Sequence, residues 1–193
     1  FMFDVKKEMK RMEARQEAQN QLNELISTEK SIDKMIDEFY TDARERLLEN
    51  DETGFELIAN SIFYFQDIKK IVQTIRVQFQ TYVKTAQFID TIGGIPPVLH
   101  KAPEIMDSMP TISRNNKDMM KFKKGLMKGQ LNIKSLSSMM NAVNPATAST
   151  RSKEEMDALK ERLLVDIGAN NAQRNNQKKS GDNEDFFAAI NQD

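Results

Sequence analysis

Apolar residues recur at intervals of mostly three and four along the first part of the chain, which is typical of an amphipathic helix. Residues 4–49 contain neither Gly nor Pro and are rich in good helix formers. Glu29 interrupts the apolar stripe, and in the first twenty residues only Val5, Met9 and Met12 lie on a possible stripe. We therefore expect one long helix that packs less firmly at its N-terminal end. The recurring positions are Leu22, Leu25, Ile32, Ile36, Phe39 and Ala43.

A clearer repeat runs through residues 55–92. Two sets of apolar residues, each spaced by seven and offset by three, occupy the a and d positions of a heptad seam. We expect this seam to join the two arms of a hairpin and to serve in assembly. Ile62 and Ile71 are among the residues that widen the stripe, so this helix should pack against more than one neighbour. The seam residues are Phe65, Ile68, Val72, Ile75, Phe79, Tyr82, Ala86 and Ile89.

Two breaks divide this helical sequence. Residues 50–54 combine Asn, Asp and Gly, which indicates a turn and hence an antiparallel hairpin over 4–92. A second break at 93–97 contains Gly and Pro, which end helices, and we interpret it as a hinge or corner. Shorter helices are expected over 98–143, which completes a helical core of residues 1–143. The hinge residues are Gly93, Gly94, Pro96 and Pro97.

The C-terminal part is predicted to be separate from this core. Residues 144–152 have the composition of a linker. Ser152 and Glu155 form a capping-box pattern, which predicts a short helix over 153–168 that ends at a Gly. The polar residues 169–193 are expected to be a disordered tail that carries a short amphipathic motif. The predicted fold class is therefore all-α: a long antiparallel helical hairpin, shorter helices and a partly disordered tail.

Composition excludes several classes of protein. With 28 basic and 29 acidic residues the net charge is −1, so overall charge favours neither nucleic acid nor membrane as a partner. The absence of Cys excludes disulfides, Cys-ligated zinc and thiol catalysis, and is compatible with a cytoplasmic protein. No stretch approaches 18 consecutive apolar residues, so no segment is predicted to span a membrane.

Residues that carry catalytic chemistry are scarce. His100 is the only histidine and has no second His or Cys as a metal partner. No Gly-rich phosphate loop, dinucleotide fingerprint or nucleophile elbow is present. The carboxylates of the first helix are expected to form a solvated face. We therefore predict that the chain is not an enzyme and has no cofactor.

A cluster of lysines forms the densest basic patch. It is interpreted either as a solvated helix face or as a contact for an anionic surface, a lipid headgroup layer or an acidic partner. Nucleic acid is not expected, since no aromatic residues are interleaved in the way that base stacking requires. The cluster consists of Lys117, Lys121, Lys123, Lys124, Lys128 and Lys134.

Two short stretches near the C-terminus are candidates for partner binding. Each has an apolar edge beside predicted disorder, where motifs that bind as a helix in a groove are often found. The alternative for the first stretch is a helix that docks back on the hairpin. The candidate residues are Leu159, Arg162 and Leu163 in the first stretch, and Phe186, Phe187 and Ile190 in the second.

The order of these parts resembles the ESCRT-III family, including its archaeal cell-division members. The hairpin, the break at 93–97, the Met- and Lys-containing segment 114–143 and the detached helix all match that layout. Leu159-x-x-Arg162-Leu163 looks like part of the family motif that binds a partner ATPase. The resemblance implies a subunit that polymerises with copies of itself or related subunits on an anionic membrane and remodels or severs it. It also implies that the C-terminal helix binds a partner AAA+ ATPase.

A second interpretation stays open. Heptad seams also build coiled-coil scaffold or assembly proteins that have no membrane activity, such as virion components. The membrane polymer is expected in the cytoplasm, peripheral to a membrane. The lysine cluster distinguishes the two hypotheses, because only the membrane polymer needs these lysines for lipid binding.

Overall fold

The computed structural model describes residues 2–88, 101–108, 117–128, 131–142 and 151–190. All secondary structure within these ranges is helical, which confirms the all-α fold of a long hairpin followed by shorter helices. The helices are α1 (Met2–Leu48), α2 (Glu52–Phe88), α3 (Lys101–Ser108), α4 (Lys117–Met127), α5 (Ile133–Ala142) and α7 (Lys153–Ile190).

The turn of the hairpin is held by paired caps. The N–H of Asn50 donates to the carbonyl of Leu47 (3.2 Å) and the N–H of Asp51 to that of Arg46 (2.9 Å), which is the Schellman pattern. Asn50 takes the left-handed backbone conformation that this pattern requires, with a φ of 57°. The carboxylate of Asp51 then accepts the N–H of Gly54 (2.9 Å) and so caps α2. The turn is therefore tighter than the predicted 50–54, since α2 already begins at Glu52.

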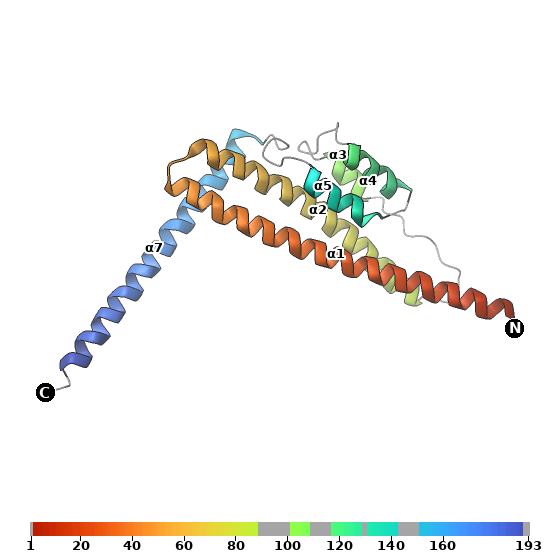
Figure 1. Ribbon diagram of the computed structural model, residues 1–193, viewed down its shortest axis with the longest axis horizontal. Helices are drawn as coiled ribbons and strands as arrows, with labels where there is room; N and C mark the ends of the chain where they lie inside the picture. Colours follow the sequence, from red (N-terminus) through yellow and green to blue (C-terminus); the bar gives the residue numbers. More distant parts are fainter. Residues whose placement is uncertain (1, 89–100, 109–116, 129–130, 143–150, 191–193) are drawn as a thin grey trace.

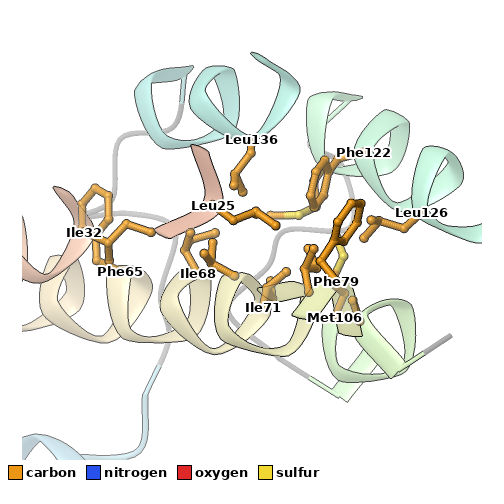
Figure 2. Close-up of a cluster of buried hydrophobic side chains, with 14 of the residues drawn as sticks. Leu25, Ile32, Phe65, Ile68, Ile71, Phe79, Met106, Phe122, Leu126 and Leu136 are labelled. Atoms are coloured by element: carbon orange, nitrogen blue, oxygen red, sulfur yellow. The ribbon is translucent and has the colours of Figure 1, made fainter. Parts of the chain in front are cut away.

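The main core lies where α3, α4 and α5 cover the hairpin (Figure 2). Five of the predicted seam residues of α2 are buried, Tyr82 is half-buried and Ile89 lies outside the described residues. Phe122 and Leu126 of α4 approach Phe79, while Leu136 of α5 approaches Leu25 of α1. The prediction that α2 packs against several neighbours is confirmed. The buried seam residues are Phe65, Ile68, Val72, Ile75 and Phe79.

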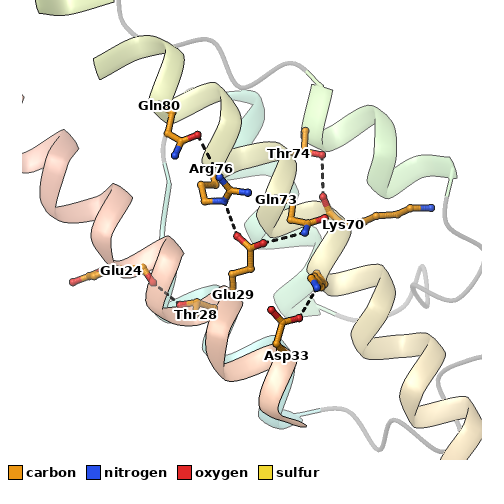
Figure 3. Close-up of polar contacts among 10 residues, drawn as sticks. Glu24, Thr28, Glu29, Asp33, Lys70, Gln73, Thr74, Arg76 and Gln80 are labelled. Atoms are coloured by element: carbon orange, nitrogen blue, oxygen red, sulfur yellow. Dashed lines mark hydrogen bonds and ion pairs between the residues drawn. The ribbon is translucent and has the colours of Figure 1, made fainter. Parts of the chain in front are cut away.

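A charged group interrupts the apolar contact between α1 and α2 at Glu29 (Figure 3). Its carboxylate accepts hydrogen bonds from Nε of Arg76 (2.6 Å) and Nε2 of Gln73 (3.0 Å). Only 15% of the Glu29 side chain and 26% of the Arg76 side chain are exposed. A partly buried charge needs its partner in place, so this contact fixes how α1 and α2 align along their length.

A second apolar cluster lies at the turn end of the hairpin, where α7 crosses it (Figure 1). We call this end the hairpin tip. Leu159 and Leu163 of α7 are buried there against Leu47 of α1 and Phe55 of α2. The rest of α7 projects away from the hairpin as an arm, at the end of the molecule opposite the N-terminus.

The structure differs from the predicted end of this last helix. The helix begins at Lys153, as expected, but it does not end at Gly168 and runs to Ile190, through the segment predicted as a disordered tail. A Gly inside a helix costs roughly 1 kcal/mol relative to Ala but removes no hydrogen bond. No Pro occurs between 153 and 190, so nothing in the covalent chain forces a break.

The cap of α2 predicts an unusual response to Gly54→Ala. A Cβ at this position would lie 2.1 Å from Oδ2 of Asp51, so the substitution should displace the capping carboxylate. We expect Gly54→Ala to lower the free energy of unfolding by about 1 kcal/mol, similar to Asp51→Ala, although Ala is the better helix former. Chemical denaturation followed by circular dichroism measures this.

The double variant provides the control. Once Asp51→Ala has removed the obstructing carboxylate, adding Gly54→Ala should be neutral or stabilising. The exposed Thr53→Ala should change the free energy of unfolding by less than about 0.5 kcal/mol. Additive losses in the double variant would contradict this account of the cap.

Candidate functional site

Four lysines line one side of α4 and its C-terminal end. Lys117, Lys121, Lys124 and Lys128 are spaced by four, three and four residues and are all exposed. This spacing keeps them on one side of a helix. We call them the lysine stripe. Within the described part of the chain, no ion pair involves any of them.

The opposite side of α4 is built into the core. Met119, Phe122 and Leu126 are buried, at 4%, 2% and 1% exposure. These residues pack against the hairpin and its neighbouring helices, so they determine how α4 is rotated about its axis. The lysine stripe therefore faces outward because the apolar side of the same helix faces inward.

The other two predicted lysines are not part of the stripe. Lys123 forms an ion pair with Asp107 of α3, and its side chain is only 24% exposed. Lys134 is exposed but lies on α5. The structure thus separates the six-residue cluster into an outward-facing stripe, one lysine that joins α4 to α3, and one on another helix.

Two methionines lie beside the stripe in an unusual environment. Met120 is 53% exposed and Met127 is 68% exposed. They are seven residues apart and therefore share one side of α4. Met106 and Met119, by contrast, are buried in the core. The outer surface of α4 therefore combines a row of positive charges with two flexible apolar side chains, a combination that suits the boundary of an anionic layer.

The predicted partner-binding residues of α7 contact the hairpin in this structure. Leu159 and Leu163 are 7% and 1% exposed. The guanidinium of Arg162 lies 5.8 Å from the ring centroid of Tyr40 in α1, within the range of a cation–π contact. The alternative interpretation of this stretch, a helix that docks back on the hairpin, describes what the structure shows.

The start of α7 is tied to α2 by a contact that the sequence did not predict. Arg151 donates to Asp67 of α2 at 2.7 Å, and the two side chains are 19% and 7% exposed. Arg151 also lies 5.2 Å from the ring centroid of Phe63 and 3.1 Å from the carboxylate of Glu155. We call this group the α7 anchor. The sequence does contain one signal for the α7 anchor. Asp67 is the only carboxylate within the mostly apolar stretch 61–68, and a carboxylate that is buried needs a partner.

The predicted capping box is present beside the anchor. The N–H of Glu155 donates to Oγ of Ser152 (3.3 Å), and the N–H of Ser152 donates to the Glu155 carboxylate (3.2 Å). Hydrogen bonds from its own backbone N–H and from Ser152 lower the pKa of the adjacent Glu154. Ion pairs of Lys160 with Glu52 and of Arg44 with Asp166 add to the contact between α7 and the hairpin.

The residues that the structure describes were compared for groups that could hold a metal or line a pocket. The described residues include no cluster of three His, Cys, Asp or Glu side chains able to hold a metal. An open groove of about 390 Å³ between α1 and α7 is lined by Arg44, Arg174, amides and apolar residues. Burial raises the pKa of Tyr64 to about 12, so this phenol stays neutral at physiological pH.

Several predicted residues have no described side-chain geometry. His100 and the hinge lie outside the described residues, as does Ile89. The second C-terminal motif lies on the backbone of α7, but its side chains are not described. None of the described helices has a stretch long and apolar enough to cross a lipid bilayer. The hinge residues are Gly93, Gly94, Pro96 and Pro97, and those of the motif are Phe186, Phe187 and Ile190.

The anchor predicts that α7 can be loosened without unfolding the hairpin. Arg151→Ala leaves the Asp67 carboxylate nearly buried without this partner, and we expect the docking of α7 to weaken by roughly 2 kcal/mol. Hydrogen exchange should show faster exchange of amides in 153–167, with protection over 55–80 unchanged.

Two variants serve as controls for the anchor. Asp67→Ala in the Arg151→Ala background removes the nearly buried carboxylate that has lost Arg151, and should restore part of the protection. Lys153→Ala changes an exposed neighbour and should leave exchange as it is in the parent chain. Unchanged protection of 153–167 in Arg151→Ala would show that the anchor does not hold α7.

Comparison with known proteins does not assign this chain to a family. No protein-family model, no curated protein and no solved structure matches it. The resemblance to the ESCRT-III family therefore stays a prediction.

Proposed function

We propose that this chain is a subunit of the ESCRT-III type that assembles on anionic membranes and remodels or severs them. The lysine stripe carries this proposal. Its four charges face outward because the opposite side of α4 is fixed in the core by Met119, Phe122 and Leu126. A rigid helix that presents charge in a row can approach a flat anionic surface without rearranging the fold.

The four charges of the lysine stripe are enough to produce measurable binding to an anionic membrane. Each lysine near an anionic leaflet contributes roughly 1 kcal/mol, so four contribute roughly 4 kcal/mol, or about a thousandfold in binding. Lys123 contributes less, since Asp107 already neutralises it. The attraction falls off within a Debye length of about 10 Å at 0.1 M salt, so binding should depend strongly on ionic strength.

The rest of the fold supports the proposal through its layout. The resemblance implies a long hairpin, shorter helices after it and a detached last helix. The fold has the hairpin, with α3, α4 and α5 against it, and a last helix, α7, which crosses the hairpin tip. The proposed ATPase contact through Leu159, Arg162 and Leu163 requires α7 to leave the hairpin tip, because both leucines are buried there. In this proposal the protein acts in the cytoplasm, peripheral to a membrane.

Charge reversal in the stripe tests the proposal. Lys121→Glu with Lys124→Glu should weaken binding to vesicles that contain anionic lipid by more than tenfold, since two attractive charges become repulsive. Neutral vesicles should bind neither the parent chain nor the variant. Co-sedimentation at 50 mM and 500 mM salt, with negative-stain microscopy of the pellets, measures binding and filament formation together.

A matched control separates position from net charge. Lys30→Glu with Lys34→Glu makes the same change in net charge on an exposed part of α1 and should keep most of the binding. If the stripe variant binds anionic vesicles as the parent chain does, the membrane proposal is wrong. Assembly into discrete particles without lipid would then favour the coiled-coil scaffold.

We expect the exposed Met120 and Met127 to add apolar contacts with the membrane, which high salt does not weaken. Met120→Ser with Met127→Ser keeps all four stripe lysines, so initial binding at low salt should change little. The fraction that stays bound after transfer to high salt should fall, because two apolar contacts with the bilayer are lost. Equal retention by the variant and the parent chain would show that these side chains stay in water.

A further inference from the structure

The N-terminal end of α1 has an apolar stripe that the described part of the hairpin leaves exposed. Val5, Met9 and Met12 are exposed to 55%, 56% and 65%. Ala18 is the first buried side chain among the described residues of α1, and none of residues 4–17 is buried. Figure 1 shows this end of α1 extending beyond the end of α2. We call Val5, Met9 and Met12 the overhang stripe.

The overhang stripe has the spacing of a coiled-coil seam. Its residues are separated by four and three positions, so Val5 and Met12 fall at the d positions of a heptad and Met9 at the a position between them. The next a position is Gln16, which is also exposed. The side of α1 that packs on α2 lies roughly 100° around the helix from this seam. The hairpin therefore leaves the overhang stripe accessible to another helix.

Each flank of the overhang stripe carries one positive and one negative side chain, seven residues apart. Lys6 and Glu13 occupy successive e positions on the flank that faces away from the hairpin, and both are exposed. On the other flank, the exposed Glu8 and the half-buried Arg15 occupy successive g positions. Charges at e and g positions determine the partner and the orientation of helices in a coiled coil. The four charges therefore restrict which helix can pack on the stripe.

A second copy of the same stripe satisfies these charges in one arrangement. A parallel pair would place Glu8 of each copy beside Glu13 of the other, because parallel coiled coils bring g next to the following e. In an antiparallel pair, e lies beside e and g beside g. With Met9 opposite Met12 of the second copy, Lys6 then lies beside Glu13. The same alignment places Glu8 beside Arg15.

The neighbouring antiparallel alignments bring like charges together. A shift of one heptad in one direction places Lys6 beside Lys6 of the second copy, and a shift in the other direction places Glu13 beside Glu13. Like charges at these flanking positions are repulsive, so charge selects the alignment with Met9 opposite Met12. Electrostatic complementarity determines register in this way more than it determines affinity.

We propose that the overhang stripe is a homodimer interface, on which the stripe of a second copy packs antiparallel with Met9 opposite Met12. The contact is two-fold symmetric and closes on itself, so it joins two chains and no more. The two hairpins extend in opposite directions from the contact. It forms without lipid and uses no residue of the lysine stripe, so it goes beyond the proposed membrane function and can fail independently of it.

Charge favours a second copy over an anionic membrane as the occupant of the overhang stripe. The charged residues nearest the stripe on the helix surface are Glu8 and Glu13, which an anionic leaflet would repel. The basic residues Lys7, Lys10 and Arg11 lie on the opposite side of α1, where they could not reach a membrane that covers the stripe. The antiparallel contact instead gives both carboxylates a cationic neighbour.

Reversing the flanking charges tests the alignment. In lipid-free buffer, sedimentation equilibrium of the parent chain should show a mass that rises with concentration from 22.2 kDa toward twice that value and no further. Lys6→Glu places a carboxylate beside Glu13 at both ends of the two-fold contact, and should weaken association about tenfold. Adding Glu13→Lys to the same chain restores opposite charges, so the double variant should associate within about threefold of the parent chain.

A matched control separates position from net charge. Lys10→Glu makes the same change in net charge as Lys6→Glu, but on an exposed position away from the stripe, and should associate as the parent chain does. Met9→Glu with Met12→Glu places carboxylates opposite one another at the centre of the contact and should leave only single chains. All these positions are exposed, so circular dichroism should show the helix content of the parent chain for every variant.

Crosslinking distinguishes antiparallel from parallel packing, and the chain contains no cysteine that would give a background. Chains with Val5→Cys mixed with chains with Gln16→Cys should form an intermolecular disulfide, because these positions lie opposite one another in the proposed alignment. Chains with Val5→Cys alone should not, since the two cysteines would be separated by 11 positions, or about 16 Å along the helix axis. A disulfide formed by Val5→Cys alone would indicate a parallel pair and contradict the proposal.

Two further outcomes would overturn the proposal. One is a parent chain that stays at one copy at every concentration. The other is a charge-swapped double variant that associates no better than Lys6→Glu alone. If the parent chain stays at one copy and Met9→Ser with Met12→Ser weakens its binding to anionic vesicles, the overhang stripe contacts a lipid surface instead.

Discussion

The apolar surface of α2 is wider than one partner helix can cover, and the rest of the structure depends on covering it. Its heptad seam packs against α1, but Ile62, Ile71 and their neighbours extend the stripe around the helix. Helices α3, α4 and α5 bury that surplus near the middle of the hairpin, and α7 buries it at the tip. The exclusion of apolar area from water therefore determines where each later helix lies.

This constraint also orients the charged surface. Because α4 must turn Phe122 and Leu126 inward, its lysines at 117, 121, 124 and 128 have to face outward. Buried charges add directional restrictions that apolar packing lacks. Glu29 is paired with Arg76 and Asp67 with Arg151, and these ion pairs favour particular alignments of α1 and of α7 on α2.

Much of the fold could be predicted because its signals are local. Heptad spacing, the Asn50–Asp51 turn and the Ser152–Glu155 box each depend on residues within a few positions of one another. The continuation of the last helix past Gly168 to Ile190 could not be predicted in this way. Gly lowers the stability of a helix but does not prevent the helix from forming. Whether a helix ends at a Gly therefore depends on the summed helix propensities of the other residues along α7.

The sequence by itself determined the all-α class, the hairpin and its seam, since a 3.5-residue period in good helix formers has few other structural outcomes. Only the tertiary structure decided which lysines lie together on the outer surface of α4 and which do not. It paired Lys123 with Asp107 and placed Lys134 on another helix. It also joined Arg151 to Asp67 across 84 positions of sequence. Such contacts depend on how helices rotate and cross once their apolar sides are buried, and no local pattern encodes that geometry.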